Sequence, residues 1–352
     1  MNGVTVLSDS EIQNIIVEYL NQNISFEELR NISQKLTDLY ISKGYVTSGA
    51  FFPEQDLTQG IAIVRVIEGS LEEINIEGLN HLSEKYLLSR LTSFTNQLVN
   101  INKLEDSIKL LRQNPLIERI DANLVEGSNV GKSKLLLNVL EAPVWSGNLL
   151  FNNYNSANNG ELQGVVGISN QNLLGIGDHI ETVYSLSDGF NSLNIGYEIP
   201  LSSLDNSLGF QYSNGDSKIT ASIFDDFGIR ADAETFMLQF DQPIVKSIDR
   251  EISIFLALER RTSNTFIDDD IPFSFTEGPE EGQSKATVLR LGSSWTERSI
   301  ESVISANSRF NLGLDLFEIT NNSEGLPDAI FLSWLGQFQF AHVLNKKRDA
   351  LL

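Results

Sequence analysis

Cysteine is absent from the 352-residue sequence, and histidine is scarce. The lack of cysteine excludes disulfides, zinc sites with thiolate ligands and cysteine nucleophiles. The three histidines, His81, His179 and His342, lie far apart and show neither metal-ligand spacing nor a His-Glu-x-x-His frame. We therefore expect surface or hydrogen-bonded histidines, and we predict neither a zinc site nor a histidine-based catalytic triad.

Positive charge is also scarce, because 25 Lys and Arg residues stand against 47 Asp and Glu residues, for a net charge of −22. This balance argues against extended nucleic-acid binding and against a polybasic membrane anchor. No run of 18 apolar residues could form a transmembrane helix, whereas membrane-spanning β-strands leave a weaker, alternating signal. No signal peptide follows Met1, so either a cytosolic protein or a sequence incomplete at its start is indicated.

Three motifs come close to known cofactor sites without completing them. Gly175-Ile176-Gly177-Asp178 lacks the third glycine of a dinucleotide fingerprint, and Glu126 stands where a P-loop ending in Gly131-Lys132-Ser133 needs glycine. The acidic runs Asp225-Asp226 and Asp268-Asp269-Asp270 lack the spacing of an EF-hand. We expect a β-turn, a hairpin turn and solvated loops at these places. The sequence predicts no cofactor, no metal and no enzymatic activity.

Residues 1–69 have the pattern of a small α+β module. Ser8 with Glu11 and Ser25 with Glu28 have the spacing of capping boxes, and apolar residues at helical period follow each serine. Gly44 marks the end of the second helix. Strands are predicted at 45–51 and 61–67, on either side of a loop that contains Pro53. A further strand, short as if cut, is predicted at 4–7.

Residues 70–143 repeat the order β-α-α-β-β. Val66-Ile67-Glu68-Gly69 has an echo 73 residues later in Val139-Leu140-Glu141-Ala142. Ser83 and Asn102 are expected to cap the two helices of this second module. Strands are expected at 74–76, 117–125 and 134–141.

From residue 144 onward helical periodicity stops, and segments of about ten residues alternate between apolar and polar or small side chains. Leu208, Phe210 and Tyr212 alternate with Gly209, Gln211 and Ser213, for example. The alternation fits a transmembrane β-barrel and also an antiparallel sandwich with one solvated face. About ten strands are predicted, near 145–155, 160–170, 178–187, 190–200, 205–214, 232–243, 249–262, 284–297, 300–312 and 330–344.

The stretch from Tyr40 to Gly69, YISKGYVTSGAFFPEQDLTQGIAIVRVIEG, resembles the signature of the ShlB-type polypeptide-transport-associated (POTRA) domain. This domain belongs to outer-membrane transporters of two-partner secretion, the hemolysin secretion/activation family. Residues 70–143 resemble the ordinary POTRA repeat. SNQNLLGIGDHIETVYSLS (169–187), GYEIPLS (196–202), RLGSSWTERS (290–299) and FLSWLGQFQFAHVL (331–344) resemble successive strands of the same family's barrel.

The resemblance implies tandem POTRA modules at 1–69 and 70–143, followed by an antiparallel transmembrane β-barrel from residue 144. The family barrel has sixteen strands, so this sequence is expected to be a fragment that ends in mid-barrel at 352. The family's Val-Arg-Gly-Tyr-type loop motif, its plug helix and part of the first POTRA strand are expected to lie outside it.

The implied function is secretion of an unfolded exoprotein of the adhesin or hemolysin type through the outer membrane, with the POTRA modules in the periplasm and without ATP. A client would add a strand to exposed sheet edges, and the resemblance places those edges on the second strand of each module. The candidate client-binding residues are Tyr45, Val46, Thr47, Phe51, Ile120, Ala122, Asn123 and Val125. Two alternatives are a barrel-assembly factor of the wider superfamily and a soluble β-sandwich adhesin.

Overall fold

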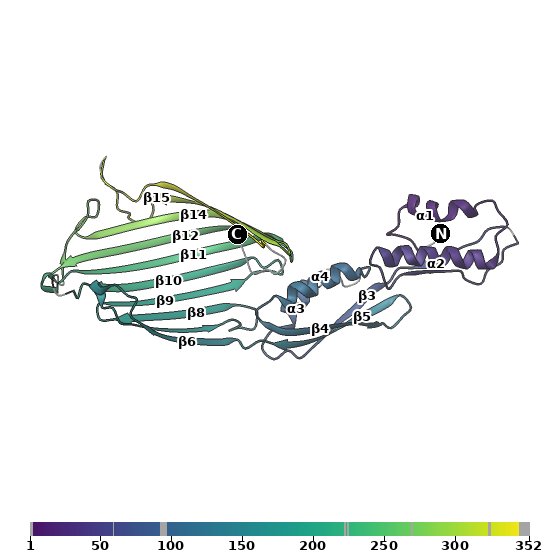
Figure 1. Cartoon of the computed structure of the whole chain (residues 1–352), viewed down its shortest axis with the longest axis horizontal. Coiled ribbons are helices and arrows are strands. Elements are labelled where there is room, and N and C mark those ends of the chain that lie inside the picture. The colour runs from purple at the N-terminus through teal and green to yellow at the C-terminus, as the bar shows by residue number, and fades with distance from the viewer. Residues whose placement is uncertain are drawn as a thin grey trace. The chain divides into compact units, whose positions relative to one another are not determined.

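The computed structural model describes residues 3–58, 60–91, 97–221, 223, 225–268, 270–322 and 325–344. The chain forms two compact units, Met1–Ala142 and Pro143–Leu352 (Figure 1). The first unit combines helices with two small sheets, and the second is one large sheet. Among the residues described, no helix has the length and apolar character needed to cross a membrane.

The first unit begins with two helices, α1 (Asp9–Ile16) and α2 (Phe26–Ser42), with a 3₁₀-turn at Val17–Tyr19 between them. Both predicted capping boxes are present, because the N-cap serine and the glutamate three residues on exchange hydrogen bonds at the start of each helix. The apolar stripe of α2 forms the centre of a small core, in which Leu36 and Tyr40 are fully buried.

The strands of this first half are shorter than the sequence predicts: β1 covers only Gly49–Phe51 and β2 only Arg65–Ile67. The expected start of β1 is wrong because α2 ends in a Schellman motif. Gly44 has φ +89°, and the Tyr45 N–H donates to the Tyr40 carbonyl at 2.9 Å. Upstream of β2, the Gln55 amide binds both the N–H and the carbonyl of Ile63 and replaces a strand partner.

The second half of the unit consists of β3 (Ser70–Glu77), α3 (Glu84–Leu91), α4 (Ile101–Arg112), β4 (Ile117–Glu126) and β5 (Lys132–Glu141). This is the predicted β-α-α-β-β order. The strands lie in the order β3-β5-β4, with β3 parallel and β4 antiparallel to β5. Helix α4 is capped by Asn100, whose side chain accepts from the Lys103 N–H, and not by Asn102 as expected.

A glutamate at the end of the last strand performs the same task in both halves of the unit. Glu141 corresponds to Glu68 in the repeated motif. Its carboxylate accepts backbone N–H groups from Asn80, His81 and Leu82 at 2.7–3.1 Å. These residues lead directly into α3 through Ser83, whose side chain accepts from the Tyr86 N–H.

Glu68 likewise accepts the N–H groups of Thr5 and Val6, together with the Thr5 and Tyr40 hydroxyls. The sequence GVTVLS at 3–8 thus corresponds to GLNHLS at 78–83. Residues 4–7 form no strand, contrary to expectation, because the Thr5 and Val6 N–H groups in their middle bind this carboxylate on the way into α1.

The second unit is a single antiparallel sheet in which the long strands pair in sequence order, so the ten predicted strands are confirmed and the two-sheet sandwich is wrong. Its long strands are β6 (Trp145–Asn152), β7 (Gln163–Asn170), β8 (His179–Ser187), β9 (Phe190–Pro200), β10 (Ser207–Lys218), β11 (Arg230–Lys246), β12 (Arg250–Ile267), β14 (Gln283–Arg298), β15 (Ser302–Leu314) and β16 (Leu332–His342). The short β13 (Ile271–Pro272) pairs with β12, and 3₁₀-turns lie at Ala157–Asn159 and Asp225–Phe227.

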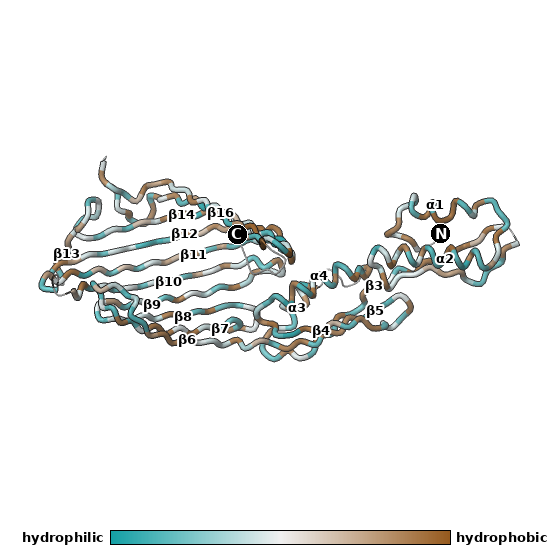
Figure 2. The backbone as a smooth tube through the Cα atoms, viewed as in Figure 1, coloured by the Kyte–Doolittle hydropathy of each residue, from teal (hydrophilic) through white to brown (hydrophobic). Residues whose placement is uncertain are grey.

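The two faces of this sheet differ in character, as the alternation predicts. Figure 2 shows hydrophilic and hydrophobic residues alternating along its strands. Directly paired residues on one face form an apolar row across six strands: Leu208, Phe240, Leu256, Leu291, Phe310 and Trp334. One position along, the opposite face carries a polar and small row: Glu198, Gly209, Gln239, Ala257, Arg290, Asn311 and Ser333. The large apolar side chains of the first row lie mostly exposed.

Glu141 should make the first unit's stability depend on pH. Burial opposes its ionisation, but the three backbone N–H donors outweigh burial and hold its pKa below the usual value. The stabilisation is therefore complete above the unfolded-state pKa and disappears as pH falls through the folded-state pKa. We expect Glu141→Gln to destabilise the unit by about 1–3 kcal/mol at pH 7 and by much less at pH 3.

Hydrogen exchange of residues 78–91 in the full chain, corrected for intrinsic rates, measures this effect. Glu77→Gln, at an exposed glutamate ending β3, is the matched control and should change little at either pH. An equal loss of protection at pH 7 and pH 3 for Glu141→Gln would show that the carboxylate charge is not responsible.

Candidate functional site

Within the described part of the chain, no group of three or more His, Asp or Glu side chains could hold a metal ion. His342 stacks on Phe340, and His81 lies exposed beside Glu141. Gly175 and Gly177, both with positive φ, lie in the connection between β7 and β8, and Gly131 lies in the hairpin between β4 and β5, as predicted. Asp268 and Asp270 lie in the segment after β12, and Asp269 falls outside the described residues.

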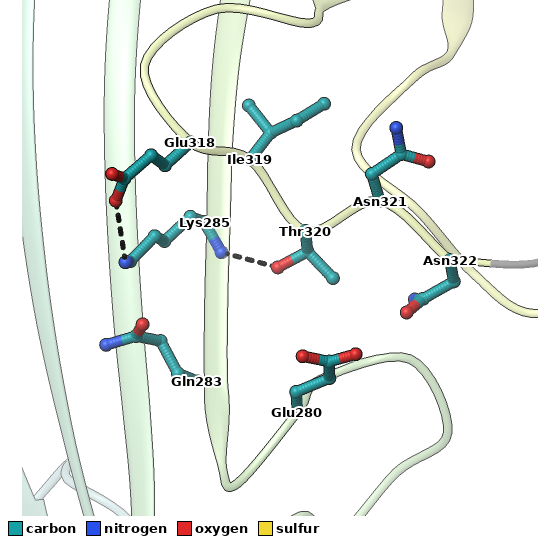
Figure 3. Close-up of a pocket in the computed structure, with 8 residues that line it drawn as sticks. All are labelled: Glu280, Gln283, Lys285, Glu318, Ile319, Thr320, Asn321 and Asn322. Atoms are coloured by element: carbon teal, nitrogen blue, oxygen red, sulfur yellow. Dashed lines mark hydrogen bonds and ion pairs between the residues drawn. The ribbon is translucent and has the colours of Figure 1, made fainter.

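A polar pocket of about 190 Å³ lies beside the start of β14 (Figure 3). Lys285 pairs with Glu318 at 3.8 Å, and the Lys285 N–H donates to Thr320 Oγ1 at 2.9 Å. Asn322 donates to the Gly278 carbonyl at 2.7 Å. These bonds attach two connecting segments to the sheet and to each other. The lining residues include no paired nucleophile and base, so the pocket offers no catalytic chemistry.

The edge of the three-stranded sheet is the more informative site, because β4 pairs with β5 on one side only. The Ile120 carbonyl points away from β5, since it accepts from the Arg112 guanidinium at 3.3 Å. Its cross-strand partner Val139 directs its own carbonyl toward Gly78, on the side of β3. Ile120 and Val139 are therefore a non-hydrogen-bonded pair.

Backbone direction alternates along a strand, so Ala122 and Leu124 share the outward orientation of Ile120. Their N–H and C=O groups face off the sheet, whereas those of Asn123 and Val125 bind β5. Among the predicted residues of β4, the Ile120 side chain is buried in the core, while Ala122, Asn123 and Val125 are exposed. The structure thus adds Leu124 to the predicted set, on the grounds of backbone direction alone.

The corresponding edge of β1 is already occupied. The Ala50 N–H donates to Thr37 Oγ1 at 2.9 Å, so the middle residue of β1 has its outward backbone group bound by α2. Phe51 is exposed at the end of β1. Tyr45, Val46 and Thr47 lie in the turn between α2 and β1 and not on the predicted strand.

Hydrogen bonds connect the two halves of the first unit at the end of α2. Asn100 donates from Nδ2 to the Lys43 carbonyl at 3.0 Å, and the Ile101 N–H donates to the Gly44 carbonyl at 2.8 Å. A β-carbon on Gly44 would meet Asn102 Nδ2 at 2.8 Å. The start of α4 is therefore built against the C-terminal cap of α2, which fixes β1 and β4 within one unit.

Two family models match the chain. The model of the ShlB-type POTRA domain matches residues 1–69, and that of the haemolysin secretion/activation protein ShlB/FhaC/HecB matches residues 131–351. Outer membrane transporter CdiB of Dickeya dadantii is 24% identical over 344 residues, covering 95% of this chain and 59% of the relative. Heme/hemopexin transporter protein HuxB of Haemophilus influenzae is 25% identical over 182 residues, covering 51% of this chain and 32% of the relative.

Solved structures agree in fold. CdiB from Escherichia coli superposes with a TM-score of 0.69 at 22% identity, covering 98% of this chain and 64% of that chain. BamA from Haemophilus ducreyi lacking POTRA domains 1–3 gives 0.58 at 14% identity, covering all of this chain and 68% of that one. The chain spans about three fifths of the length of the CdiB relatives it matches.

The junction between the two halves should depend on Asn100 and not on Asn102. Asn100→Ala removes both the N-cap of α4 and the bond to Lys43, which should cost about 1–2 kcal/mol. Asn102→Ala is the matched control within the same turn and should cost less than half of that. Hydrogen-exchange protection of α4 and of the last turn of α2, in the full chain, measures both; a larger loss for Asn102→Ala would contradict the observed cap.

Proposed function

The chain belongs to the haemolysin secretion/activation protein family ShlB/FhaC/HecB, whose model matches residues 131–351. From this membership we propose that the protein secretes an unfolded exoprotein across the outer membrane. In this proposal residues 144–352 supply barrel wall, and residues 1–69 and 70–143 are two POTRA domains in the periplasm. The client is an adhesin or hemolysin type of exoprotein that binds in unfolded form.

The two-faced sheet of the second unit is the observation that carries this proposal. An apolar row with exposed Leu256, Leu291 and Trp334 suits contact with lipid, and the polar row on the opposite face suits a water-filled lumen. Transport through such a lumen requires no nucleotide, and no nucleotide motif is complete in the sequence. The CdiB relatives are named outer membrane transporters, which supports an outer-membrane location.

Client recognition is assigned to the free edge of β4. An extended client segment would pair its backbone with the outward N–H and C=O groups of Ala122 and Leu124, in the manner of β-augmentation. Exposed Val125 and Asn123 would contact its side chains. Because Thr37 already binds Ala50, the first POTRA domain would contribute through Phe51 and the turn residues Tyr45, Val46 and Thr47, and not through a continuous strand edge.

Ala122→Pro in the full-length protein tests this assignment. Proline removes an N–H that β5 does not use, so the sheet should persist while strand addition is blocked. We expect client binding and secretion to fall at least about tenfold. Ala122→Ser keeps the N–H and serves as the matched control. Asn123→Pro would be uninformative, because it removes a bond within the sheet.

Two outcomes would contradict the proposal. Unchanged secretion by Ala122→Pro, with hydrogen-exchange protection of β5 intact, would exclude the β4 edge as the docking site. Loss of many unrelated outer-membrane barrels on deletion of the protein, with client secretion unaffected, would instead indicate a barrel-assembly factor.

A further inference from the structure

Arg309 lies on the polar face of the second unit, in a row of directly paired residues. From β11 to β16 this row contains Asp241, Phe255, Gly292, Arg309 and Leu335. Gly292, opposite Arg309, has no side chain, and the Phe255 ring fills the position of its β-carbon. The two residues directly opposite Arg309, Gly292 on β14 and Leu335 on β16, therefore offer its guanidinium no side-chain acceptor.

Among the residues that the structure describes on β14 and β16, no carboxylate lies opposite or diagonal to Arg309. The residues diagonal to it on β14 and β16, within reach of a long side chain, are Arg290, Ser294, Ser333 and Gln337. Among the described residues, Arg309 makes no side-chain hydrogen bond or ion pair, and its Nε is enclosed without an acceptor. A cation held in this way gives up favourable interactions that an anion could restore.

Arg290, on the adjacent strand of the same face, differs from Arg309 in its terminal nitrogens, because its Nε is likewise without an acceptor but Nη1 and Nη2 are both bound. Its Nη2 donates to both carboxylate oxygens of Glu259 at 2.7 Å, and its Nη1 donates to Asn311 at 3.0 Å. Asn311 in turn donates to Ser333 at 3.0 Å. This network spans four strands, and within it Glu259 pairs with Arg290 and not with Arg309.

Other acidic side chains of the polar face lie farther away. Glu181, Glu198 and Asp241 are on β8, β9 and β11, and Glu251 on β12 lies in the row of Ser305, four residues along β15 from Arg309. Asp241 shares the row of Arg309 but is separated from it by three strand spacings, roughly 14 Å. Among the described carboxylates of the polar face, Glu259 pairs with Arg290, and none pairs with Arg309.

We propose that Arg309 is a binding site for a carboxylate of a polypeptide segment lying against the polar face. The inference rests on the proposed function, which brings polypeptide to this face. A guanidinium presents parallel N–H donors that match the two oxygens of a carboxylate, and it stays charged at every physiological pH. Acidic side chains of the segment would thus be held at β15.

Peptide binding to the full chain in detergent micelles tests the site without any need for transport. The probe is a fluorescent, unstructured Gly-Ser peptide with three glutamates, compared by anisotropy with the same peptide carrying three glutamines. We expect the wild-type chain to favour the glutamate peptide roughly tenfold. Arg309→Gln should abolish this preference, and Arg309→Lys should retain part of it. Arg261→Gln, at an exposed arginine on the same face, should retain all of it.

A second variant covers the case in which Arg309→Gln fails to fold. Leu335→Glu places a carboxylate directly opposite Arg309 and should also remove the preference, whereas Leu335→Gln should not. A glutamate preference that survives both Arg309→Gln and Leu335→Glu would overturn the proposal. So would displacement of the peptide by acetate at equal carboxylate concentration, which would show binding of small anions. Loss of secretion with peptide preference intact would count against the proposed function and not against this site.

Discussion

Antiparallel pairing of neighbouring strands is the constraint on which the second unit depends. Once β6 to β16 pair in order, the two-residue period of each strand assigns every side chain to one of two faces. A slip of β12 by one residue against its neighbours β11 and β14 would move Leu256 to the polar face and Glu259 to the apolar one. The register therefore decides at the same time what can face lipid, what can line water and which charges can meet.

The first unit depends on a different device, a carboxylate that holds the backbone entering a helix. Glu68 and Glu141 each bind the amides between a glycine and the N-cap serine of the following helix. The device ties the end of the last strand to the start of the first helix, which are distant in sequence. Its repetition explains why the Val-x-Glu echo is visible in a sequence whose two halves otherwise differ.

The sequence predicted most of this architecture, because capping boxes, helical stripes and alternating strands are local patterns. Two of the failures come from side chains that bind backbone elsewhere in the chain, whereas the late start of β1 and the cap of α4 at Asn100 are local features of helix ends. Glu68 accepts the backbone N–H groups of Thr5 and Val6, and Gln55 replaces a strand partner at Ile63. Backbone direction at Ala122 and the isolation of Arg309 depend on pairing register, which sequence alone did not supply. The predicted client-binding residues stay a prediction.

The free edge of β4 is short, because Arg112 already binds the carbonyl of Ile120 and the hairpin follows Glu126. Each backbone hydrogen bond contributes only about 1 kcal/mol net in water. An added strand could thus gain only a few kcal/mol from this edge, so its residence time would be brief. In the proposed function a short residence time is useful, because a client that binds segment by segment must also dissociate segment by segment. A longer edge would bind each segment more tightly and slow transport of the client.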